Sequence, residues 1–217
     1  ELNHAVFKIL SAKEKDDIYN IFKSKENINK LRYTMLYFRL MEQGGKWREE
    51  LLSKVGVDLE HMDPSKVFDL LDKIKPHLAA HEYMFGQITR PSPQEIKTVM
   101  EASGKTRQEA EKEIMDSKNK DLIEDSLSVY QGYLVLKDAK EELERNPNNS
   151  YLRQTFTPQL EREYKALSKI VAMIEPLFEQ HPDMLAKVRN SYEVDALAKA
   201  DKARRAVEEK HFNAIKD

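Results

Sequence analysis

Residues 106–150 read TRQEAEKEIMDSKNKDLIEDSLSVYQGYLVLKDAKEELERNPNNS, and they determine most of the expected architecture. Thr106 and Glu109 have the spacing of a capping box, in which each residue's side chain accepts a hydrogen bond from the other's backbone N–H. No proline follows until Pro147, so the pattern predicts one long helix to about Arg145. The loop-forming residues 146–150 then predict that the chain reverses its direction.

The residues after this loop predict the second arm of a helical hairpin. Thr157 and Pro158 combine a capping residue with a proline at the first helical position. Apolar side chains then recur at helical intervals, at Leu160, Tyr164, Leu167, Val171, Ile174 and Phe178. We expect this stripe to be buried against residues 122–143. Interruptions at Pro176 and at His181-Pro182 precede a final alanine-rich helix.

The N-terminal residues also form helical patterns. Ser11 and Glu14 have capping-box spacing, which predicts a helix over about 12–43 that ends at Gly44-Gly45. A shorter helix is expected over 46–55. Further start and stop signals lie at Gly56, at Asp63-Pro64, at Pro76, at Ser92-Pro93 and at Gly104.

No segment alternates apolar and polar residues over a useful length, so the fold class is predicted to be all-α. The expected architecture is an elongated multi-helix bundle, with an N-terminal helical subdomain over residues 1–90 and a long C-terminal helical hairpin over 91–217. A glycine- and proline-containing stretch over 86–93 is the expected boundary. One continuous domain is the alternative.

Composition narrows the classes of function. A charged fraction of 34% with a net charge of −2 gives no electrostatic basis for nucleic acid as a partner. With no cysteine, thiolate nucleophiles and thiolate metal sites are excluded. No apolar run is long enough for a transmembrane segment. We therefore expect a soluble protein, either cytoplasmic or secreted, and predict no cofactor. Because the first residue is Glu1, we expect a processed chain or a domain of a longer protein.

A metal site is one candidate. His77 and His81 lie four residues apart, which places both imidazoles on one face of a helix where they could bind zinc or another divalent ion, and Glu82 is adjacent. Against this, Pro76 disturbs the helix, Glu82 does not have the position that metalloproteases use, and no third ligand is evident. Hydrogen-bonded or partly exposed histidines are the favoured interpretation.

A partner-binding surface is the second candidate. Met84, Phe85 and Ile88 concentrate apolar area beside helix-breaking residues, and Arg90 follows. Methionine, aromatic residues and arginine are enriched at the centres of interfaces. We expect these four residues to lie on a surface that a protein partner covers. A second aromatic group, at Tyr33, Tyr37, Phe38 and Trp47, is interpreted mainly as core.

Two further patterns are weaker. Lys199, Lys202, Arg204 and Arg205 form a basic group that could bind an anion or an anionic lipid and so give peripheral membrane contact, although nearby acidic residues favour a solvated face. The tripeptide over 104–106, Gly-Lys-Thr, has the end of a phosphate-binding loop but lacks its first glycine. A helix C-cap followed by an N-cap is the favoured interpretation there.

The sequence thus predicts a non-catalytic helical protein–protein interaction domain, such as a scaffold, an adaptor or a secreted bacterial effector module. It would hold a protein partner in a groove or on a face between the N-terminal helices and the hairpin. The alternatives are a metal-dependent enzyme centred on His77, His81 and Glu82, and an anionic-lipid-binding helical domain. The oligomeric state is left open.

Overall fold

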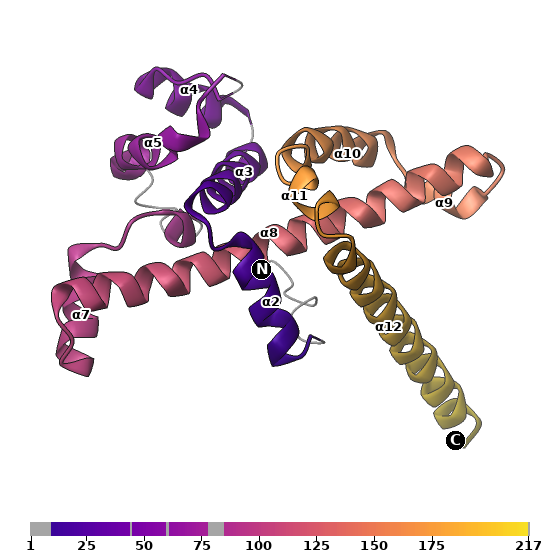
Figure 1. The fold of residues 1–217 in the computed structure, drawn as a ribbon. Coiled ribbons are helices and arrows are strands. Elements are labelled where there is room, and N and C mark those ends of the chain that lie inside the picture. The colour runs from indigo at the N-terminus through magenta and orange to yellow at the C-terminus, as the bar shows by residue number, and fades with distance from the viewer. Residues whose placement is uncertain (1–9, 44, 60, 78–84, 217) are drawn as a thin grey trace.

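The computed structural model describes residues 10–43, 45–59, 61–77 and 85–216 and is 84% helical (Figure 1). No strand occurs within these ranges. The prediction of an all-α multi-helix bundle is confirmed. None of the described helices combines the length and the apolar content that are needed to span a bilayer.

The longest element is α8 (Arg107–Arg145), which begins and ends where the sequence predicts. Thr106 Oγ1 accepts from the N–H of Glu109 at 3.3 Å, and Glu109 Oε2 accepts from the N–H of Thr106 at 3.0 Å. Its 39 residues span about 58 Å at 1.5 Å per residue. Figure 1 shows α8 crossing the molecule, and helices from both halves of the chain pack along it.

The predicted helix over 12–43 is instead two helices, α2 (Ala12–Phe22) and α3 (Lys25–Gln43). The reason is a second capping residue that the periodicity concealed. Ser24 Oγ accepts from the N–H of Asn27 at 3.2 Å, and Asn27 Nδ2 donates back to the carbonyl of Ile21 at 3.0 Å. The expectation of one continuous helix is therefore wrong, because Ser24 starts a new helix in a new direction.

Shorter elements follow α3, and most of their limits agree with the predicted signals. They are α4 (Gly45–Val55), η1 (Pro64–Lys66), α5 (Val67–Ile74), η2 (Lys75–His77) and η4 (Gly86–Ile88). Asp63 Oδ1 accepts from the N–H of Ser65 at 3.0 Å, which caps η1. Pro76 lies in the 3₁₀ turn that follows α5, so the α-helix ends before this proline, as expected.

The longer helices after residue 90 also begin at the predicted signals. Ser92 and Glu95 form a capping box at the start of α7 (Pro93–Ser103). Beyond α8 come α9 (Ser150–Thr155), α10 (Pro158–Val171), α11 (Glu175–Glu179) and α12 (Pro182–Lys216), of which the short helices α9 and α11 were not expected. Figure 1 shows α9 at the end of α8, α10 returning towards the N-terminal helices, and α12 leading away from the body. The division of the chain near residue 90 stays a prediction.

The core joins α8 to both halves of the chain. Val171 and Ile174 are fully buried in one cluster with Leu127, Tyr130 and Leu134, as predicted. Leu167 is only partly buried, because its face of α10 borders the groove described below.

Two further contacts tie the N-terminal helices to this core. The rings of Tyr130 and Phe178 stack at 4.2 Å, and Phe22 of α2 lies 5.5 Å from Phe178. A buried ion pair of 2.9 Å between Arg39 and Asp125 fastens α3 to α8.

Candidate functional site

A groove lies between α3, α4 and the segment 57–59 on one side and α10 on the other. It consists of two adjacent hollows of about 490 and 480 Å³, which share Met41 and Ala166 in their lining. We call it the α3–α10 groove. Its lining residues are Tyr37, Phe38, Met41, Arg48, Leu52, Val57, Asp58, Leu59, Arg162, Glu163, Lys165, Ala166, Leu167, Lys169 and Ile170.

The wall from the N-terminal half is mostly apolar, with Arg48 and Asp58 as its two charged residues. α3 packs on α8, and Tyr37, Phe38 and Met41 of α3 remain partly exposed in the groove. The segment after α4 is held in place because Gly56 adopts a left-handed conformation at φ +66° and the N–H of Val57 donates to the carbonyl of Leu52 at 3.2 Å.

A side-chain bond also anchors this wall. The hydroxyl of Tyr33 donates to the carbonyl of Leu59, so this aromatic residue secures the segment that borders the groove. The wall is therefore fixed by α3 itself and by the turn that ends α4.

The wall from α10 carries three parallel stripes, which follow from the helical spacing. The first is the predicted core stripe, in which Tyr164 stacks on Tyr133 of α8 at 5.6 Å. The second stripe, Ala166 and Ile170, forms the groove side of the helix. The third consists of Arg162, Lys165 and Lys169, spaced three and four residues apart along one edge of the groove.

The charges around the groove are unbalanced. Arg48, Arg162, Lys165 and Lys169 line it together with Asp58 and Glu163, which leaves an excess of two positive charges on a chain whose net charge is −2. Asp58 Oδ2 lies 2.5 Å from His61 Nδ1. Lys165 Nζ lies 3.8 Å from Glu161. Within the part of the chain that the structure describes, Arg162 and Lys169 make no ion pair.

The predicted partner-binding residues lie elsewhere, and two of them are not on the surface. Phe85 and Ile88 are 1% and 0% exposed, so the expectation that they form an exposed surface is wrong. The turn η4 packs against α8 and α3, and Lys118 Nζ donates to the carbonyl of Gly86 at 2.6 Å. Helix-breaking residues interrupt the backbone here, but α8 still covers the side chains.

The other two residues of that prediction have different outcomes. Arg90 is exposed, pairs with Asp72 at 3.3 Å and places its guanidinium 4.9 Å from the ring centroid of Phe68. These contacts are within the chain. Met84 lies outside the described residues.

The metal prediction stays untested. His77 is exposed at the end of α5 and η2, while His81 and Glu82 lie outside the described residues. In the ranges that are described, no three His, Asp or Glu side chains are grouped as a metal ion would require.

The basic group on α12 is described only in part. The backbone of α12 is helical throughout, and Arg205 is exposed on it, whereas the side chains of Lys199, Lys202 and Arg204 lie outside the described part. Binding of an anion or a lipid by this group stays a prediction.

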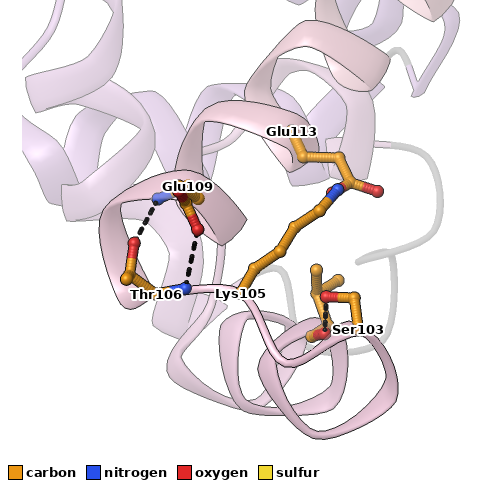
Figure 2. A network of polar contacts seen from close by, with 6 residues as sticks. Ser103, Lys105, Thr106, Glu109 and Glu113 are labelled. Atoms are coloured by element: carbon orange, nitrogen blue, oxygen red, sulfur yellow. Dashed lines mark hydrogen bonds and ion pairs between the residues drawn. The ribbon is translucent and has the colours of Figure 1, made fainter.

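The Gly-Lys-Thr tripeptide is a junction between two helices, as the favoured interpretation predicts (Figure 2). Gly104 ends α7 at φ +67°, and Ser103 Oγ donates to the carbonyl of Val99 at 2.6 Å. The backbone N–H of Thr106 already donates to Glu109, and Figure 2 shows Lys105 extending to its ion-pair partner, Glu113. These groups are engaged within the chain rather than arranged around a phosphate.

The sequence predicted a groove or face between the N-terminal helices and the hairpin but not the residues of the α3–α10 groove, although two of its signals were visible. Tyr37 and Phe38 belong to the aromatic group singled out above, and the three- and four-residue spacing of the basic residues on α10 is evident in the sequence. What the sequence does not reveal is that α10 lies beside α3. The side chain of Trp47, the last member of the aromatic group, is outside the described part.

No protein-family model matches the chain, and no curated protein or solved structure is similar to it. The geometry and chemistry of the groove are therefore the basis for inferring a function.

Proposed function

We propose that this chain is a non-catalytic helical interaction domain that binds a segment of a partner protein in the α3–α10 groove. One observation carries the proposal. Apolar side chains from two helices that are distant in sequence, Tyr37, Phe38 and Met41 on α3 and Ala166 and Leu167 on α10, lie half-buried along the two adjacent hollows of this groove.

The chemistry of the groove supports binding. Covering apolar area contributes about 25 cal/mol per Å², and aromatic, methionine and arginine side chains are the residues most enriched at interface centres. The groove offers two aromatic rings, Met41 and two arginines. Its walls are helices that the core holds in place, so little ordering is required when a partner binds.

Two helices with a groove between them favour a helical segment as the occupant, in the mode where an amphipathic helix places its apolar face into the groove. Ala166 has the smallest side chain of the wall and lies in both hollows, so a partner backbone can approach α10 most closely there. A large side chain at position 166 should therefore block the groove.

The experiment is a selection of displayed peptides of about 16 residues, long enough for four helical turns, on the folded chain. Selected peptides should protect amides of α3 and α10 from hydrogen exchange. Ala166→Trp should weaken their binding at least about tenfold, equivalent to about 1.4 kcal/mol. The matched control is Ala102→Trp, because Ala102 is exposed on α7 at the other end of α8 (Figure 1).

Two results would contradict the proposal. One is a set of selected peptides that bind wild-type protein and Ala166→Trp equally. The other is exchange protection that lies outside α3, α4 and α10. Melting curves of both variants must first show that each is folded, so that lost binding reports on the groove.

A further inference from the structure

The charged residues of the α3–α10 groove indicate which kind of partner segment binds there. This inference rests on the proposed function. The groove is positive on a chain that is negative overall, and its cations are arranged in order rather than scattered. Arg162, Lys165 and Lys169 extend over about 10.5 Å of α10, two turns of helix, along one edge. Arg48 of α4 lies across the same hollow.

We propose that the occupant is an acidic amphipathic helix of a partner protein. Its apolar face would lie on Tyr37, Phe38, Met41 and Ala166, and carboxylates on the flank of that face would meet the basic edge of α10. Carboxylates three, four or seven residues apart on a helix share one side, so their spacing matches that of the three cations.

The weak or absent internal partners of these basic side chains support the same conclusion. Arg162 and Lys169 have no ion pair in the described part of the chain, so a carboxylate from outside would not have to displace an internal one. Lys165 has only a long contact of 3.8 Å to Glu161. Arg48 Nη1 donates to Met41 Sδ at 2.8 Å, a weak acceptor that a carboxylate would outcompete.

A protein helix fits these observations better than a membrane surface does. The cations border a concave groove whose floor is apolar, so one ligand must supply an apolar ridge and acidic groups beside it. A lipid headgroup region is broad and nearly flat, and it would reach the exposed cations without filling the two hollows.

The selected peptides supply the first test, through their composition. Peptides that bind in the groove should be amphipathic and acidic. For the tightest of them, replacing each Glu and Asp by Gln or Asn should weaken binding about tenfold or more at about 50 mM salt. That difference should shrink at about 300 mM salt, where the screening length falls from about 14 Å to about 6 Å.

The second test reverses the charges on the protein. Arg162→Glu combined with Lys169→Glu should weaken binding of the acidic peptide about tenfold or more and should favour its Lys-substituted analogue. The control is Lys97→Glu combined with Lys112→Glu, an equal change of charge at exposed positions of α7 and the start of α8. This control should leave the affinity unchanged within about twofold. All four replaced side chains are exposed, so both variants should remain folded.

The outcomes separate this inference from the proposed function. Groove-bound peptides that are neutral or basic, or an affinity that Arg162→Glu with Lys169→Glu leaves intact, would overturn the acidic partner and leave the interaction domain standing. A selection without groove-bound peptides would overturn both. Binding to vesicles of phosphatidylcholine and phosphatidylserine that the same double change abolishes, with no acidic peptide bound, would assign the cations to a lipid surface and overturn the inference.

Discussion

Two groups of apolar side chains in the N-terminal half of the chain differ in their exposure to solvent. Phe85 and Ile88 are fully buried under α8, although glycine and proline residues surround them. Tyr37, Phe38 and Met41 belong to a regular helix, yet they remain partly exposed along the α3–α10 groove. The regular segment is the open one, and the irregular segment is the covered one.

The difference shows that coverage depends on a third element rather than on local regularity. η4 contacts both α8 and α3, so its apolar side chains are enclosed on two sides. At the groove, α3 and α10 contact each other, but no described helix fills the two hollows beside them, and the hollows stay open. A partner helix would supply the missing third element there.

The largest expected effect on stability comes from a change in the covered group, Phe85 and Ile88. Phe85→Ala should lower the free energy of unfolding by about 3–5 kcal/mol, because it removes a buried ring and leaves a cavity. Phe38→Ala, in the open group, should cost only about 1–2 kcal/mol, because part of that ring is already in water. Urea unfolding followed by circular dichroism measures both. Equal losses for the two variants would show that the contrast between covered and open groups is mistaken.

The limits of most helices could be predicted from the sequence because they depend on local bonds. Capping boxes at Ser92 and Thr106, the caps at Asp63 and Thr157 and the left-handed Gly104 all involve residues within four positions of one another. The wrong limit at Ser24 also has a local cause. The apolar periodicity continues across Ser24, so periodicity alone predicts one helix, although the serine caps a second one.

The groove could not be predicted in the same way, because it forms from residues about 120 positions apart. Periodicity shows that α3 and α10 each have an apolar face, but not how wide the covered part of that face is. Leu167 illustrates this: it belongs to the predicted core stripe, yet it lines the open hollow. The same limitation explains why Phe85 was expected on the surface. Glycine and proline show where the backbone leaves the helix, but not which element packs over the side chains there.

A smaller expected effect is the pH dependence of stability that arises from the buried Tyr130. Burial, and secondly the charge of Glu175, raises the pKa of Tyr130 from 10 to about 12. The folded state therefore holds the phenol proton more tightly than the unfolded state does. This contribution to stability is complete below pH 10 and is lost as the pH rises towards 12.

The expected loss is about 1.4 kcal/mol per pH unit within that window, or about 2–3 kcal/mol in total. Tyr130→Phe removes the titrating group but keeps the ring that stacks on Phe178. Between pH 9 and pH 12, wild type should therefore lose about 2–3 kcal/mol of unfolding free energy relative to this variant, with most of the loss between pH 10 and pH 12. Parallel pH profiles would show that the phenol of Tyr130 titrates alike in both states.

The smallest expected effect concerns Arg90, at the exposed rim of the covered group. Arg90→Ala removes an ion pair of 3.3 Å to Asp72 whose side chains are 56% and 49% exposed, and such pairs contribute about 0.2–1 kcal/mol. It also removes a positive charge near Arg32, which donates to Asn119 Oδ1 at 2.7 Å and stacks over Phe68 at 4.2 Å. Burial, and secondly the charge of Arg90, lowers the pKa of Arg32 to about 10, so losing that charge relieves a repulsion.

The two effects of Arg90→Ala oppose each other, and urea unfolding should place this variant within about 1 kcal/mol of wild type. A loss above about 2 kcal/mol would mean that Arg90 helps to cover Phe85 and Ile88, so that it belongs to the covered group rather than to the exposed surface.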